Sequence, residues 1–189
     1  MNNKQYRMLE LLDGQISECV ECELHTGGRC KPYWTEDSKY VIVGEAPGKN
    51  EVEQNKPFCG TAGNHLWGIM KLQGFHREDF LIINSTNCRP VVGNKNGKPN
   101  LTQIQTCRKW IRKYLTVLKP EAILILGNYA MGTMSDQSFG IMSMNSEILN
   151  NDEFGCRMVL SVHPSMCIYR GKEGQQMLLE SVKALRSIV

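Results

Sequence analysis

Three short apolar runs, each followed by a loop and a segment of helical periodicity, constrain the fold more than any other feature. They lie at residues 40–43, 80–84 and 122–126, and they are apolar almost throughout. Runs of this kind are typical of strands whose two faces are both covered. Strands that alternate with helices predict a parallel sheet with helices on each side. We therefore expect an α/β protein, a three-layer α/β/α arrangement around a mainly parallel four-stranded sheet.

The other elements follow from the spacing of apolar residues. Helices are expected over residues 4–18, 62–73 and 173–189, and a fourth strand over 157–162. Another helix begins at Thr102, where its hydroxyl and the Gln105 amide can cap each other's free N–H groups, and it ends at Pro120. Neither an internal repeat nor a linker divides the pattern, so residues 1–189 are expected to form a single domain.

Composition limits the classes of function. The chain has 189 residues, of which 41% are hydrophobic, and 22 basic against 19 acidic residues give a formal charge of +3. This mild excess is compatible with a polyanionic partner but does not require one. The first residues lack the apolar core of a signal peptide, and no apolar run approaches the roughly 18 residues of a membrane span. We expect a cytoplasmic monomer that does not enter a membrane.

Polar and glycine-rich segments follow the predicted strands. They are Gly44 to Gly48, Asn84 to Pro90, Gly127-Asn128 and His163 to Ser165. Because parallel strands all end at one edge, these segments should meet there, where such sheets bind ligands. Each also has an ordinary interpretation: Glu45 as a capping or solvated carboxylate, Asn84 as a turn former, His163 as a loop histidine and Phe58 as a core residue.

Eight cysteines in a reducing compartment indicate metal binding, redox chemistry or simple burial rather than disulfides. Cys19 and Cys22 form a CxxC, whose spacing suits a tetrahedral metal or a cluster. Two further ligands are needed, and Cys88 and Cys107 are favoured because a strand end and a helix fix their backbones. Cys30 is the rival fourth ligand. Small buried side chains are expected at the remaining positions, Cys59, Cys156 and Cys167.

Taken together, four motifs carry a resemblance to a known family. They are GEAPG at residues 44–48, PFCGTAG at 57–63, an asparagine four residues before the Cys88-Arg89-Pro90 triplet, and His163-Pro164-Ser165. The set resembles the family 4 iron–sulfur uracil-DNA glycosylases from Cys19 to about Arg170. The resemblance implies an enzyme that flips a pyrimidine out of DNA, hydrolyses its N-glycosidic bond and releases uracil.

The resemblance also implies roles for individual residues. Catalytic roles fall on Glu45, Asn84 and His163; substrate contacts fall on Gly44, Ala46, Pro47, Gly48, Glu51, Phe58 and Ser165; DNA contacts fall on Arg89, Lys95 and Arg170. A 4Fe-4S cluster, with zinc as the less favoured occupant, would be bound by Cys19, Cys22, Cys88 and Cys107 and would be structural. Ala46 stands where other branches of the superfamily carry an activating Asp, so catalysis should depend on electrostatics and positioning.

Departures from the family pattern leave two alternatives open. Asn87 replaces a lysine, Val91 replaces a proline, and the following loop is longer and richer in glycine than usual. A site altered in this way suggests a glycosylase that excises a bulky modified cytosine, such as glucosylated hydroxymethylcytosine, from viral DNA as a defence. The other alternative is a non-catalytic, cluster-bearing protein that only binds nucleic acid.

Overall fold

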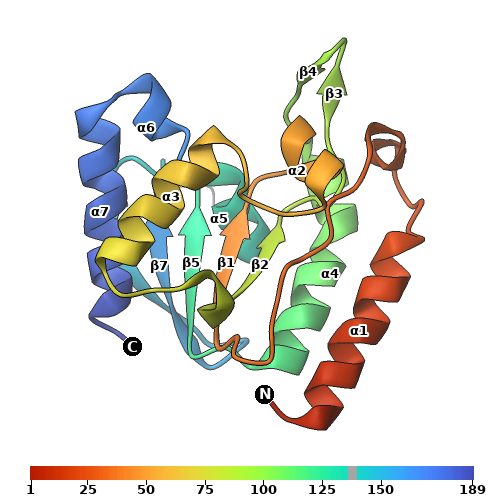
Figure 1. Ribbon diagram of the computed structural model, residues 1–189, viewed down its shortest axis with the longest axis horizontal. Helices are drawn as coiled ribbons and strands as arrows, with labels where there is room; N and C mark the ends of the chain where they lie inside the picture. Colours follow the sequence, from red (N-terminus) through yellow and green to blue (C-terminus); the bar gives the residue numbers. More distant parts are fainter. Residues whose placement is uncertain (136–139) are drawn as a thin grey trace.

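The computed structural model describes residues 1–135 and 140–189 and has the expected layered architecture (Figure 1). Its elements, in chain order, are α1 (Asn3–Ser17), η1 (Glu23–Gly27), β1 (Tyr40–Gly44), α2 (Lys49–Gln54), α3 (Thr61–Leu72), η2 (Arg77–Asp79), β2 (Phe80–Asn84), β3 (Val91–Val92), β4 (Lys95–Asn96), α4 (Leu101–Leu118), β5 (Ala122–Leu126), α5 (Asn128–Met134), β6 (Ile148–Asn151), β7 (Cys156–Ser161), α6 (Met166–Tyr169) and α7 (Lys172–Arg186).

The central sheet has five strands in the order β2-β1-β5-β7-β6, so the expected number of four was wrong. The four expected strands are mutually parallel, and β6 adds an antiparallel edge beside β7. Strand β6 has the sequence Ile-Leu-Asn-Asn and is only partly buried. A short, polar edge strand lacks the apolar run from which the other four were predicted.

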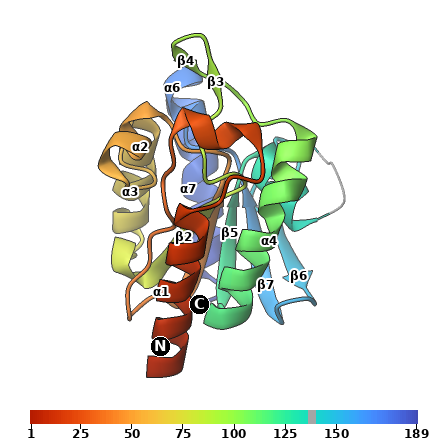
Figure 2. The same cartoon turned by 90° about the vertical axis from the view of Figure 1, so that its right-hand side faces the viewer.

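Alternate residues of each parallel strand enter two separate hydrophobic cores. Val41 and Val43 of β1 pack in a core with residues of α1 and α4, whereas Ile42 packs with residues of α3 and α7. Figures 1 and 2 show α1 and α4 on one side of the sheet and α3 and α7 on the other. Burial on both faces explains why these strands read as continuous apolar runs.

The N-cap of helix α4 lies two residues before the predicted capping residue, Thr102. Its N-cap is Asn100, whose Oδ1 accepts from the Gln103 backbone N–H at 2.9 Å, while Gln103 Oε1 accepts from the Asn100 N–H at 2.8 Å. Thr102 therefore lies within the first turn and is not the cap. Asparagine is at least as good an N-cap as threonine, and this pair satisfies both orphan donors.

None of the helices in residues 1–135 and 140–189 is long and apolar enough to cross a membrane.

Candidate active site

The loops that follow the four parallel strands meet at the carboxyl edge of the sheet, as the sequence predicted. Gly44 at the end of β1 pairs with Asn84 at the end of β2, and its carbonyl accepts from the Ser85 N–H at 2.8 Å. On the far side of β1, the Gly127 N–H donates to the Ser161 carbonyl at 2.8 Å. This edge, with Gly44, Glu45, Phe58, Asn84 and His163, is called the carboxyl-edge site below.

Gly44 lets two of these side chains approach the backbone. A Cβ atom on Gly44 would lie 2.2 Å from Asn84 Oδ1 and 2.7 Å from Phe58 Cζ. Asn84 is buried, so its amide is fixed at the end of β2 over the backbone of β1. The absent Cβ therefore creates the space in which an aromatic ring and an amide come together.

Phe58 reaches this position through a strained backbone. Its φ of 51° lies in the left-handed region, which costs an ordinary L-residue on the order of 1 kcal/mol or more. Its carbonyl accepts from Trp67 Nε1 at 3.2 Å, and a Cβ on Gly63 would lie 2.0 Å from the same carbonyl oxygen. The Phe58 and His163 rings are 6.1 Å apart between centroids and inclined by 36°.

Glu51 links the loop after β1 to Phe58. Its Oε2 accepts from the Gly48 N–H at 2.5 Å, and its Oε1 accepts from the Phe58 N–H at 2.5 Å. Charge-assisted bonds of this length are among the strongest in proteins. Both carboxylate oxygens are thus bonded to backbone, which indicates that Glu51 positions the site.

The hydrogen bonds of His163 define its tautomer. The Ser165 backbone N–H, which can only donate, lies 3.2 Å from His163 Nδ1, and Ser165 Oγ lies 2.9 Å from the same nitrogen. Nδ1 must therefore accept, and the ring proton is on Nε2. Burial lowers the pKa of His163 from 6.5 to about 4, so the ring is neutral near pH 7.

Glu45 is a half-buried carboxylate beside this cluster. Burial raises its pKa, and the positive charge of Lys98 acts against that rise. The Glu45 carbonyl accepts from the Thr86 N–H at 3.2 Å, which joins the loops after β1 and β2. Lys98, whose effect on Glu45 was not predicted from the sequence, lies in the loop between β4 and α4.

The predicted DNA-contacting residues lie around the carboxyl-edge site without entering it. Arg89 Nε donates to Asn96 Oδ1 at 2.6 Å, and Lys95 lies in the exposed strand β4. Arg170 follows α6 and forms an exposed ion pair with Glu173 at 2.8 Å. Ala46 and Pro47 complete the loop that Glu51 holds.

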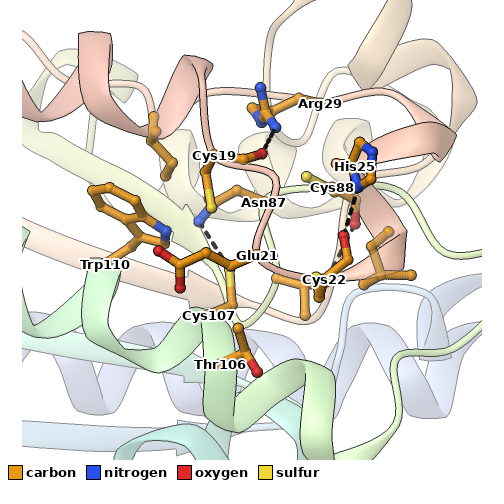
Figure 3. Close-up of a pocket in the computed structure, with 13 residues that line it drawn as sticks. Cys19, Glu21, Cys22, His25, Arg29, Asn87, Cys88, Thr106, Cys107 and Trp110 are labelled. Atoms are coloured by element: carbon orange, nitrogen blue, oxygen red, sulfur yellow. Dashed lines mark hydrogen bonds between the residues drawn. The ribbon is translucent and has the colours of Figure 1, made fainter.

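The four favoured cysteines line one small pocket (Figure 3). Cys19 and Cys22 follow α1, Cys88 follows β2, and Cys107 lies on α4. Asn87 Nδ2 donates to Cys107 Sγ at 3.6 Å. Burial raises the pKa of Cys107 to about 11, with a smaller contribution from the neighbouring thiols of Cys88 and Cys22.

Cys30 lies elsewhere. Its thiol is buried, and burial, with Glu51 and Cys59 as smaller causes, raises its pKa to about 12. Cys30 is absent from the lining of the cysteine pocket. The structure therefore places Cys88 and Cys107, and not Cys30, beside the CxxC. Cys156 and Cys167 are buried as expected, whereas Cys59 is only partly buried.

Arg29 is a residue of the cysteine pocket that the sequence analysis missed. Its guanidinium donates to the carbonyls of Ser17 and Cys19. Burial raises the pKa of Cys88, and the positive charge of Arg29 acts against that rise. The position of Cys19 beside it is visible in Figure 3. No local sequence signal marks such an arginine, because its partners are backbone atoms of another segment.

The fold and the carboxyl-edge site together define the class of protein. The family model described as the uracil DNA glycosylase superfamily matches residues 32–186, and the chain belongs to that family. Within it, the chain is similar to type-4 uracil-DNA glycosylases from several organisms. That of Archaeoglobus fulgidus is 29% identical over 164 residues, covering 82% of this chain and 81% of the relative.

The Thermotoga maritima relative is 27% identical over 188 residues, covering 96% and 95% of the two chains, and the Pyrobaculum aerophilum relative is 29% identical over 164 residues, covering 85% and 80%. The resemblance predicted from the four motifs is confirmed. The modified-cytosine and non-catalytic alternatives find no support among these relatives.

Proposed function

We propose that this protein excises uracil from DNA by hydrolysing the N-glycosidic bond, leaving an abasic site. The observation that carries the proposal is the convergence of Phe58, Asn84 and His163 around Gly44 at the carboxyl edge of the sheet. An aromatic face, an amide and an N–H donor are the groups that bind a flipped pyrimidine. Proteins named type-4 uracil-DNA glycosylases are the relatives reported above.

Phe58 and Asn84 would bind the base. The Phe58 ring, which is 4% exposed, would stack on the base, and base-aromatic stacking is worth about 1–3 kcal/mol. The Asn84 amide can both donate and accept, which suits the edge of uracil, with its adjacent N–H and carbonyl groups. Because Asn84 is buried, a base whose edge leaves the hydrogen bonds of this amide unmade binds less tightly.

His163 would stabilise the leaving group. When the bond between the sugar C1′ and the base N1 breaks, its electron pair stays on the base, and negative charge develops on the base oxygens. The neutral imidazole presents its Nε2–H as a donor, because Nδ1 accepts from the Ser165 N–H. A single preorganised donor at a developing oxyanion contributes about 10²–10³-fold in rate.

Glu45 would act on the sugar side of the same bond. Its carboxylate stabilises the positive charge that develops on the sugar and orients the attacking water. The hydroxyl of that water joins C1′, and its remaining proton balances the charge of the released uracil. Since Ala46 supplies no base, the reaction depends on placing charges correctly rather than on strong proton abstraction.

The protein would bind DNA as its substrate. It would act as a monomer in the cytoplasm. Arg89, Lys95 and Arg170 surround the carboxyl-edge site and would contact phosphates. Residues of α6, where Ile168 and Tyr169 are exposed, would fill the space that the flipped nucleotide leaves. The remaining loop residues, Gly44, Ala46, Pro47, Gly48 and Ser165, would line the path of the sugar and the phosphate.

A 4Fe-4S cluster would be held by Cys19, Cys22, Cys88 and Cys107. The four thiols fit it as a donor set, because they line one pocket and come from rigid elements. Within the described ranges, no three His, Cys, Asp or Glu side chains are grouped for a single metal ion. When bound, the group would supply cross-linking of α1, the loop after β2 and α4.

Mass spectrometry of released bases tests the proposal. The purified protein is incubated with otherwise identical oligonucleotides that carry uracil, thymine, hydroxymethylcytosine or glucosylated hydroxymethylcytosine at one position. We expect free uracil from the first oligonucleotide only, and a rate at least about 100-fold lower for His163→Gln. If the wild-type protein releases no uracil, the proposed function is wrong.

A further inference from the structure

The β3–β4 hairpin projects from the carboxyl edge of the molecule and was not predicted from the sequence. Val91 pairs with Asn96 and Val92 with Lys95, and the two residues between the strands form the turn. Figures 1 and 2 show this hairpin rising beyond the end of β2. Its valines are exposed, Val91 by 43% and Val92 by 70%. The hairpin therefore presents two apolar side chains to solvent at the carboxyl edge.

Specific contacts hold the hairpin against the carboxyl-edge site. Asn96 Oδ1 accepts from Arg89 Nε at 2.6 Å, and Asn96 Nδ2 lies 3.1 Å from the position of a Cβ on Gly48. The Gly97 N–H donates to the Pro90 carbonyl at 2.8 Å, which closes the base of the hairpin. Any ligand bound at Gly44 to Gly48 therefore lies next to the hairpin.

The charge of the segment identifies the partner. Residues 85–100 contain three cations, Arg89, Lys95 and Lys98, and neither Asp nor Glu. A protruding hairpin with Lys95 and Val92 paired beside its turn, and with Arg89 and Lys98 at its base, suits DNA, whose phosphates alternate with sugar and base surfaces. An acidic protein surface would also match the charge, but it would not lie at the edge where the base enters.

The order of the strands determines where the hairpin and α6 lie relative to each other. The hairpin follows β2 at one margin of the sheet, whereas α6 follows β7 on the other side of β1 and β5. Both project from the same edge in Figure 2. We propose that the hairpin is a second DNA grip, which contacts the DNA on the β2 side of the flipped nucleotide while α6 contacts it on the β7 side. This inference rests on the proposed function for the identity of the DNA substrate.

The test measures DNA affinity as a function of salt concentration. Fluorescence anisotropy gives the dissociation constant of uracil-free duplex and single-stranded oligonucleotides for the wild-type protein, Lys95→Ala, Val92→Ser and the control Lys183→Ala. Lys183 is exposed near the C-terminal end of α7, away from the carboxyl edge. All three substituted positions are exposed, and thermal melting of each variant checks that its fold is intact.

We expect Lys95→Ala to bind DNA more weakly and to lower the slope of log K against log salt by about 0.9 for duplex or about 0.7 for a single strand. Val92→Ser should weaken binding without changing the slope, since it removes no charge. Lys183→Ala should match the wild type. A wild-type slope and affinity in both hairpin variants would overturn the second grip.

The two proposals can fail separately. Affinity for uracil-free DNA does not depend on excision, so a changed slope in Lys95→Ala supports the grip even if the wild type releases no base. Conversely, a wild type that releases uracil while Lys95→Ala keeps the wild-type slope retains the proposed function and overturns the grip.

Discussion

Replacing Gly44 by alanine tests whether the close contact of Asn84 and Phe58 with Gly44 keeps these two side chains in position. The new Cβ would lie 2.2 Å from Asn84 Oδ1 and 2.7 Å from Phe58 Cζ, whereas ordinary contacts begin at 3.4 Å. Gly44 lies in a regular strand, so alanine suits its backbone and the clash alone is tested. Asn84, the end of a buried strand, must therefore move by about 1 Å, and a displacement of that size costs about 10²-fold in rate.

The expected effect on stability is smaller than the effect on the reaction. Overpacking of this kind destabilises by about 1–3 kcal/mol. Gly14→Ala is the matched control, because Gly14 lies on the exposed face of α1 with nothing within 4 Å of its added Cβ. In a helix this change stabilises by about 0.5–1 kcal/mol, and it should leave the rate unchanged.

Single-turnover release of uracil at saturating enzyme, together with urea denaturation, gives both quantities. A double-mutant cycle with Asn84→Ala then isolates the cause. If Gly44→Ala acts by displacing the Asn84 amide, it should lower the rate much less in the Asn84→Ala background than in the wild type. A Gly44→Ala enzyme with the wild-type rate would refute the idea that this contact positions Asn84.

Three further predictions concern other parts of the two sites. The folded pKa of His163 is lowered from 6.5 to about 4, so the unfolded chain binds more protons between those pH values. The wild type should therefore lose more stability than His163→Gln as pH falls from about 6.5 to 4. Equal losses of stability in thermal melts of the two proteins would contradict the neutral His163 ring. Glu51→Gln leaves one acceptor oxygen for the N–H groups of Gly48 and Phe58. It should lower the free energy of unfolding in urea by about 1–3 kcal/mol and also lower the rate of uracil release. Glu53→Gln, on the exposed face of α2, is the control. With the proposed cluster bound in the cysteine pocket, Cys19→Ser should lose iron, brown colour and solubility, whereas Cys30→Ser should retain all three. A colourless but stable and active Cys19→Ser protein would contradict a structural role for the proposed cluster.

Buried features were predicted from the sequence better than exposed ones. Strands β1, β2 and β5 follow from uninterrupted apolar runs, and the choice of Cys88 and Cys107 follows from the rigidity of a strand end and a helix. Strand β6 was missed because its polar residues at the sheet margin carry no hydrophobic period. The β3–β4 hairpin was also missed, although Gly93, with a φ of 59°, and Asn94 form a two-residue turn of the kind that favours hairpins.

The arrangement of the carboxyl-edge site was predictable only in outline. Parallel strand order brings four loops to one edge, but it does not show that Gly44 contacts Asn84 and Phe58 or that Ser165 sets the tautomer of His163. Those contacts depend on side-chain positions fixed by packing. Lys98 and Arg29 act on residues far away in the sequence, and neither lies in a local pattern.

The hydrogen bonds of Glu51 have a consequence for how this enzyme can diverge. The carboxylate holds the N–H groups of Gly48 and Phe58, and every residue except proline has such a group. Changing the side chains between Gly48 and Phe58 therefore leaves the two N–H groups that Glu51 accepts from in place. The segment between Gly48 and Phe58 can therefore diverge while the Phe58 ring keeps its position, as long as Glu51 is retained.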